Sequence, residues 1–135
     1  MATRTLLIDE VKALPRVEMT TELMCIEGWS EIVHWAGTPL RQLIPAHAPE
    51  YLKLATPDEL YYVGLDLESA LHPQTLLVWE MNGEALSSEH GAPLRLVIPV
   101  KYGIKSIKRV GSIRFSAERP KDYWAERGYD WYSAL

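Results

Sequence analysis

Several residue types are scarce in this chain of 135 residues, and each scarcity excludes a class of protein. A single cysteine, Cys25, excludes a disulfide within the chain and any zinc or iron–sulfur site that needs several cysteines. No apolar run approaches the roughly 18 residues of a membrane span. In MATRTLLIDE, acidic residues stand where a secretory signal peptide has its apolar region. We therefore expect a cytoplasmic protein that does not interact with membranes.

The composition is otherwise that of an ordinary globular domain. Hydrophobic residues make up 47% of the chain and charged residues 24%, and a chain of this length can bury one substantial core. Nine prolines, five tryptophans and seven tyrosines argue against disorder and against a plain helical bundle. We therefore treat residues 1–135 as one domain.

Acidic residues are also absent between His90 and Ala117, although the whole chain carries a net charge of −4. The cations of this segment are Arg95, Lys101, Lys105, Lys108, Arg109 and Arg114. A negative total argues against general nucleic-acid binding, so a basic-patch nucleic-acid binder ranks as a distant third hypothesis. An acidic protein with one basic segment is expected to hold a discrete anion there, and a phosphate group suits such a site.

Alternating hydrophobicity and turn signals predict several short strands and shorter helical turns. The expected extended segments are 5–8, 17–25, 51–55, 60–63, 75–81, 94–98 and 112–115. Asn82-Gly83 predicts a hairpin turn. Helical turns are expected at 10–14, capped by Asp9, and at 39–44 and 66–71. The sequence thus predicts an α+β domain dominated by strands, with Cys25 at the end of a strand on its more apolar face.

Five segments carry a resemblance to a known family. They are CIEGWS (25–30), WAGTPL (35–40), LLVWEMNGEAL (76–86), EHGAPLRLVIPVKYGIKSIKRVGSI (89–113) and YWAERGYDWY (123–132). In this order and spacing they resemble the molybdopterin-binding domain of the sulfite oxidase superfamily, above all its bacterial protein-methionine-sulfoxide reductase catalytic subunits. The resemblance extends from about Leu6 onward.

The resemblance implies a mixed α+β fold that holds molybdenum on the dithiolene of one pterin monophosphate, Mo-molybdopterin. It makes Cys25 the thiolate ligand of the metal, and a soft thiolate suits such a metal. From the residues alone, a lone cysteine is equally a small buried hydrophobe.

The resemblance also implies a set of pterin-holding residues. His90 supplies a polar contact and Arg95 grips the cofactor. Gly103, Ile104 and Lys105 form a phosphate loop, in which the glycine admits backbone N–H groups and the lysine neutralises charge. Thr56 corresponds to another contact of the family. Each cation taken alone is otherwise a solvated surface charge.

The implied reaction is two-electron oxygen-atom transfer with an unknown small-molecule substrate and a redox partner protein. Sulfite is disfavoured, because Trp29, Ser30 and Glu31 stand where sulfite oxidases carry an arginine. The alternative is a binding or carrier domain that holds molybdopterin or another phosphate anion without turnover.

The segment before Cys25, 24 residues long, is shorter than in the family's enzymes. This N-terminally short domain would leave its pocket open on one side. We therefore expect that it is either recovered largely without cofactor or closes its site by forming a symmetric homodimer.

Overall fold

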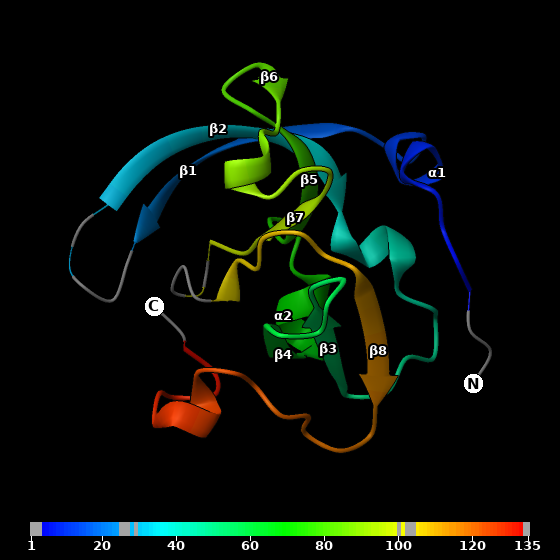
Figure 1. The fold of residues 1–135 in the computed structure, drawn as a ribbon. Coiled ribbons are helices and arrows are strands. Elements are labelled where there is room, and N and C mark those ends of the chain that lie inside the picture. Colours follow the sequence, from blue (N-terminus) through cyan, green and yellow to red (C-terminus); the bar gives the residue numbers. More distant parts are fainter. Residues whose placement is uncertain (1–3, 25–27, 29, 100, 102–104, 134–135) are drawn as a thin grey trace.

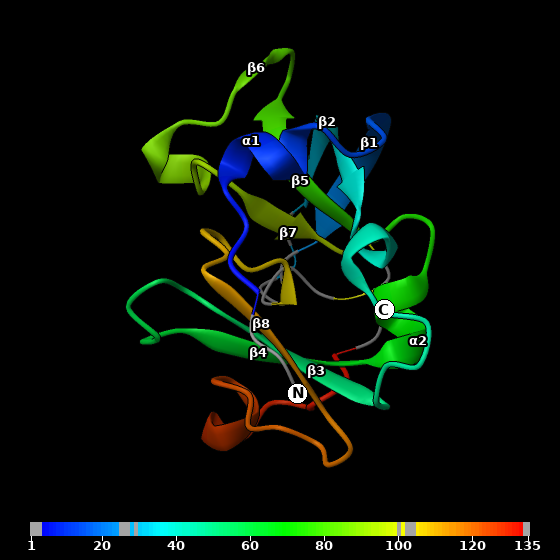
Figure 2. The same cartoon turned by 90° about the vertical axis from the view of Figure 1, so that its right-hand side faces the viewer.

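The protein is described by a computed structural model that covers residues 4–24, 28, 30–99, 101 and 105–133. Its strands form two sheets, and every strand pair in the described part of the chain is antiparallel. Figure 2 shows the sheets as an upper and a lower layer. The fold is therefore dominated by strands.

The upper sheet has the order β1-β2-β5-β6, and β7 also pairs with β5. Its strands are β1 (Val17–Met24), β2 (Ser30–Pro39), β5 (Leu76–Met81), β6 (Glu84–Ala85) and β7 (Arg95–Val97). In Figure 1, β1 and β2 form a long curved ribbon that extends away from the rest of the molecule. The ends of this ribbon define where the Cys25 segment is attached.

The lower sheet has the order β4-β3-β8. Its strands are β3 (Tyr51–Ala55), β4 (Tyr62–Asp66) and β8 (Ser112–Ser116). The C-terminal residues lie below this sheet in Figure 2, on the face turned away from the upper sheet. We call residues 117–133 the C-terminal strap.

The helices are short and lie between the strands. They are α1 (Ile8–Lys12), α2 (Leu67–Leu71) and the 3-10 turns η1 (Leu40–Leu43), η2 (Ser88–His90) and η4 (Ala125–Arg127). A strand-rich chain with a few short helices is consistent with the α+β class that the sequence predicts.

Two apolar clusters lie on opposite faces of β5, which is why its sequence reads as a continuous apolar run. Leu77 and Trp79 belong to the larger cluster between the sheets, and Val78 packs in the smaller one with Trp35. Trp35 is fully buried and Trp79 is 7% exposed. Both tryptophans are therefore core residues.

Strand β2 is the longest element that the sequence analysis missed. No strand was expected at 30–39, yet β2 continues through Gly37 to Pro39, with an irregularity between Ala36 and Gly37. A Cβ atom on Gly37 would lie 2.1 Å from the Leu77 backbone oxygen, so the glycine permits a close approach of two strands. Here the glycine belongs to a bulged strand and not to a turn.

Three smaller expectations about the elements are wrong. The segment expected to be extended at 5–8 forms no strand, because it pairs with no strand among the described residues and α1 already begins at Ile8. Asp9 does not cap the first helix, because α1 begins at Ile8 and its N-cap position is Leu7. The strand expected from Leu60 begins instead at Tyr62, because Leu60 lies in the preceding turn and is 75% exposed. A backbone turn closed by Asp58, which accepts the Leu60 N–H at 3.0 Å, displaces the strand start.

Asp66 should stabilise the start of α2 by about 1 kcal/mol. Its carboxylate accepts the Ser69 N–H at 3.0 Å and lies 3.5 Å from the Lys101 ammonium. Asp66→Ala is expected to lower the free energy of unfolding by about 1–2 kcal/mol, measured in urea at pH 7. The exposed Glu68 is the control, and Glu68→Ala should change it by less than about 0.5 kcal/mol.

The contribution of Asp66 should also depend on pH. Burial would raise the pKa of Asp66, but the hydrogen bonds from Ser69 and the charge of Lys101 outweigh burial and lower it below 3.8. The stabilisation is therefore present above pH 3.8 and is lost as the pH falls through the folded value. A difference in the free energy of unfolding between wild type and Asp66→Ala that persisted below the folded pKa of Asp66 would contradict this assignment.

Candidate functional site

The segment that contains Cys25 connects β1 to β2. Met24 pairs with Ser30 as the last pair of the ribbon, so residues 25–29 form the connection at its end. Cys25 itself lies outside the described residues, as do Gly103 and Ile104. The roles that the resemblance gives to these three residues stay predictions.

Arg95 on β7 is a buried cation with an incomplete set of partners. It is 4% exposed, and its guanidinium donates to the His90 oxygen at 3.3 Å and to the Ser106 oxygen at 3.2 Å. Its Nε has no hydrogen-bond partner among the described residues, and none of their carboxylates pairs with it. Burial lowers the pKa of Arg95 to about 10, so the group is still cationic at neutral pH.

Lys105 is also buried, but its charge is compensated within the protein. Its ammonium lies 2.6 Å from the Asp122 carboxylate and donates to the Gly64 oxygen at 2.9 Å. The Trp131 ring lies beneath it, 4.7 Å away. Burial lowers the pKa of Lys105, and Asp122 opposes that shift. The side chain thus points to the C-terminal strap, while its predicted role at a phosphate stays a prediction.

Lys101, the third buried cation, has a partner as well. Its ammonium lies 3.5 Å from Asp66 and 5.3 Å from the centre of the Tyr132 ring. Lys101 and Lys105 each have a carboxylate partner, whereas Arg95 has none in the described structure. A buried guanidinium without a counter-charge is costly unless an anion meets it.

A cavity of about 220 Å³ lies beside the segment that precedes Arg95. It is lined by Thr56, Pro57, Asp58, Ser88, Gly91, Lys108 and Arg109. Ser88 and Gly91 flank the half-buried His90, so the structure brings predicted site residues 56 and 90 to the same region. The Thr56 hydroxyl donates to Asp58 at 2.6 Å and accepts from the Tyr61 N–H at 3.3 Å, so it also holds its own turn.

Lys108 and Arg109 are exposed cations at this cavity that the sequence analysis did not single out. Lys108 donates to the Glu89 oxygen at 3.3 Å. The acid-free run between His90 and Ala117 was the signal that contained both residues, but it did not separate them from the other cations.

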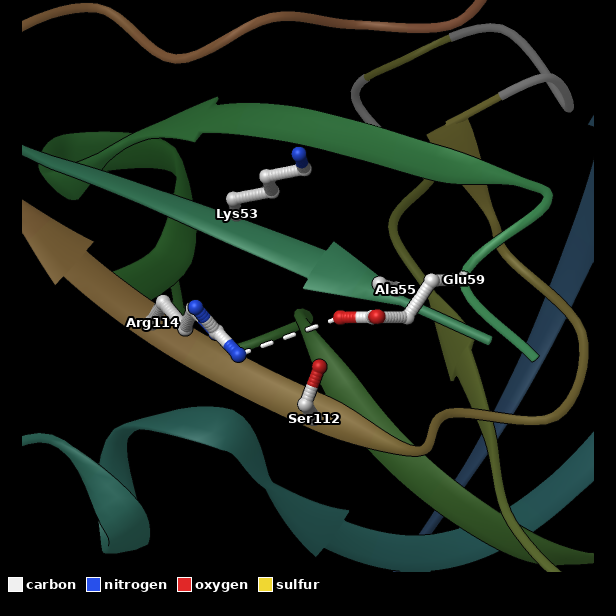
Figure 3. A pocket seen from close by; sticks show the side chains of 5 residues that line it. All are labelled: Lys53, Ala55, Glu59, Ser112 and Arg114. Atoms are coloured by element: carbon white, nitrogen blue, oxygen red, sulfur yellow. Dashed lines mark ion pairs between the residues drawn. The ribbon is translucent and has the colours of Figure 1, made fainter. Parts of the chain in front are cut away.

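A smaller hollow of about 50 Å³ lies on the lower sheet between β3 and β8 (Figure 3). Arg114 and Glu59 form an ion pair of 3.8 Å across it, with side chains 76% and 67% exposed. None of the predicted site residues lines it. An exposed, long ion pair of this kind contributes little and indicates no binding site.

Two general features of the described residues concern metals and membranes. The described residues contain no group of three or more His, Cys, Asp or Glu side chains that could hold a metal ion. Within the same residues, no helix is long and apolar enough to cross a membrane.

The fold and the site together define a strand-rich domain in which the buried Arg95 guanidinium of β7 lies against Trp35 of β2, without an anionic partner among the described residues. Residues 2–124 match the oxidoreductase molybdopterin binding domain, and the chain belongs to that family. The resemblance found in the sequence motifs is thereby confirmed, and the cofactor is Mo-molybdopterin.

Curated relatives and one solved structure agree with this membership. The chain is 37% identical to protein-methionine-sulfoxide reductase catalytic subunit MsrP of Xanthomonas campestris, over 89% of this chain and 43% of the relative. It is also 37% identical to MsrP of Campylobacter jejuni, over 89% of this chain and 47% of that one. The chain therefore spans less than half the length of these relatives.

The solved structure is that of the sulfane dehydrogenase SoxCD from Paracoccus pantotrophus. It superimposes with a TM-score of 0.76 over 84% of this chain and 35% of the other, at 21% sequence identity. This likeness supports the fold.

The described residues fit an anionic cofactor. Besides the Arg95 Nε, the Thr38 hydroxyl is buried without a hydrogen-bond partner in the described part of the chain. Buried polar groups are usually satisfied, so the Arg95 Nε fits an acceptor atom of a bound group. Thr38 pairs with Leu77, on the other face of β5 from Val78 and Arg95, and does not belong to this site.

Proposed function

We propose that this chain is the catalytic molybdopterin domain of an oxidoreductase that removes oxygen from sulfoxides. The names of the relatives suggest methionine sulfoxide in proteins as the substrate class. The sulfoxide S–O bond breaks and the oxygen leaves as water, with two electrons from a redox partner protein and two protons from solvent. When bound, molybdopterin supplies the metal at which oxygen-atom transfer takes place.

The buried, unpaired guanidinium of Arg95 is the observation that carries this proposal. Lys105 and Lys101 have carboxylate partners, whereas Arg95 has two backbone carbonyls and a free Nε in the described structure. A planar guanidinium matches phosphate oxygens or pterin carbonyls, and it can hold them with two parallel hydrogen bonds.

The other residues have distinct proposed roles. Cys25 is the thiolate ligand at the end of the β1–β2 ribbon, and backbone N–H groups of 103–105 contact phosphate. Thr56 and His90 contribute polar contacts, and Lys108 adds positive charge at the cavity.

Arg95→Met should weaken cofactor retention about 10- to 150-fold, the equivalent of about 1.5–3 kcal/mol for a lost charge-assisted hydrogen bond. The free energy of unfolding without cofactor should change by no more than about 1 kcal/mol, because removing an unpaired buried charge offsets two lost hydrogen bonds. Retention is measured as pterin fluorescence and molybdenum content after dialysis. The control is Arg114→Met, which removes an exposed cation; equal retention in both variants would exclude Arg95 as a contact.

Turnover tests the reaction separately from binding. Protein from a host that makes molybdopterin is supplied with a reduced viologen dye and a peptide that contains methionine sulfoxide. Formation of methionine supports the proposed reductase. A full molybdenum complement without turnover of this peptide would contradict it and favour the carrier alternative.

A further inference from the structure

The compensation of buried charge differs between the two most buried cations. Lys105 is neutralised by Asp122, whereas the guanidinium of Arg95 lies over the face of the Trp35 ring, with its carbon 4.8 Å from the ring centre. An aromatic face carries negative electrostatic potential and attracts a cation without cancelling its charge. A carboxylate at this position would compete with an anionic ligand, but an indole ring does not.

The Trp35 ring is held in place from the opposite strand. It is fully buried, and its Nε1 donates to the Thr21 hydroxyl at 2.9 Å. Thr21 belongs to β1, four residues before Cys25. A side chain packed on all sides and tied by a hydrogen bond has one orientation, so the ring is a fixed platform.

The same contacts leave little freedom to Arg95. Its two terminal nitrogens donate to backbone carbonyls, and its central carbon lies over the Trp35 ring. The two hydrogen bonds and the ring contact together restrict where the guanidinium can lie. The contacts of Trp35 therefore connect the strand that leads to Cys25 with the guanidinium.

We propose that Trp35 is a positioning residue of the molybdopterin site, which acts by holding the Arg95 guanidinium charged and oriented for the anionic cofactor. This inference rests on the proposed function, because the orientation of Arg95 matters only if Arg95 contacts the cofactor. It assigns no direct contact with the cofactor to Trp35.

The test compares Trp35→Leu with Trp79→Leu in the full chain. Trp79 is the matched control, because it is 7% exposed, packs in the other cluster, and has no cation over its ring among the described residues. The first readout is the Nε–H nuclear magnetic resonance signal of Arg95 in cofactor-free protein, identified by its loss in Arg95→Lys. The second is pterin fluorescence retained after dialysis at rising NaCl concentration.

In wild type, the Arg95 signal should show the upfield ring-current shift of a group above an indole face. Trp35→Leu should lose this shift and retain pterin roughly 10- to 30-fold more weakly, as expected for a desolvated cation–π contact. Trp79→Leu should keep both properties. Trp35→Phe should lie between them, because it keeps an aromatic face but loses the hydrogen bond to Thr21.

Pterin retention in Trp35→Leu equal to that in Trp79→Leu would overturn the inference while the proposed function stands. A wild type that takes up no pterin in a cofactor-producing host would overturn both. If Trp35→Leu does not fold, Trp35→Phe compared with Trp79→Phe decides the question, and equal retention in that pair overturns the inference.

Discussion

Replacing Cys25 by serine is expected to abolish turnover and the thiolate-to-molybdenum absorption. A serine hydroxyl is not ionised at neutral pH and is a hard ligand, whereas a thiolate is a soft anion that suits molybdenum. The change is nearly isosteric, and the residue follows the last pair of the β1–β2 ribbon, Met24 with Ser30. The free energy of unfolding should therefore change by less than about 1 kcal/mol.

The control for Cys25→Ser is Ser30→Ala, at the other end of the same connection. Ser30 is exposed, and its substitution should leave both absorption and turnover in place. The measurements are visible absorption of the molybdenum-loaded protein, dye-driven turnover and urea unfolding. Unchanged metal spectra in Cys25→Ser would remove Cys25 from the ligands of the metal.

Asp122→Ala should produce the largest loss of stability, about 3–5 kcal/mol, because it leaves the Lys105 ammonium buried without a counter-charge. The Asp122 carboxylate accepts three hydrogen bonds, from Lys105 at 2.6 Å and from the N–H groups of Gly64 at 2.9 Å and Ala125 at 3.1 Å. It thus joins the lower sheet to the C-terminal strap. Urea unfolding at pH 7 measures the loss.

Three further variants test the buried pair of Asp122 and Lys105. Adding Lys105→Met to Asp122→Ala should recover part of the stability, because the unpaired charge is then removed. Glu59→Ala breaks the exposed pair with Arg114 and should change stability by less than about 0.5 kcal/mol. If Asp122→Ala does not fold, Asp122→Asn keeps the acceptor atom and removes the charge. If Asp122→Ala, or Asp122→Asn in its place, is as stable as Glu59→Ala, the buried pair does not stabilise the protein.

Elements with strong local signals were predictable from the sequence. Strand β3 agrees with the expected residues 51–55, α2 follows the Asp66 cap, and Asn82-Gly83 forms the turn between β5 and β6. In each case neighbouring residues determine the conformation, either by alternation or by turn chemistry. Strand β2 was not predictable in this way, because its Gly37 bulge is explained only by the close approach of Leu77.

The candidate site shows the same division. The acid-free segment and the family motifs pointed to Arg95 and Lys105 together. Only the folded chain distinguishes them, because Asp122 lies 17 residues beyond Lys105 and pairs with Lys105 and not with Arg95. The cation–π contact of Arg95 with Trp35 also joins distant parts of the chain and has no local signature.

The C-terminal strap has a consequence for the order in which the protein is made. The N–H group of Gly64 donates to Asp122, which is made 58 residues later. Gly64 also packs against Trp131, whose ring lies where a Cβ atom on Gly64 would be. A ribosome makes β3 and β4 before these residues, so the face of β4 at Gly64 stays in water until the C-terminal strap has been made. Lys105 is made later, 17 residues before Asp122, and its ammonium can stay hydrated until the carboxylate that compensates it is available.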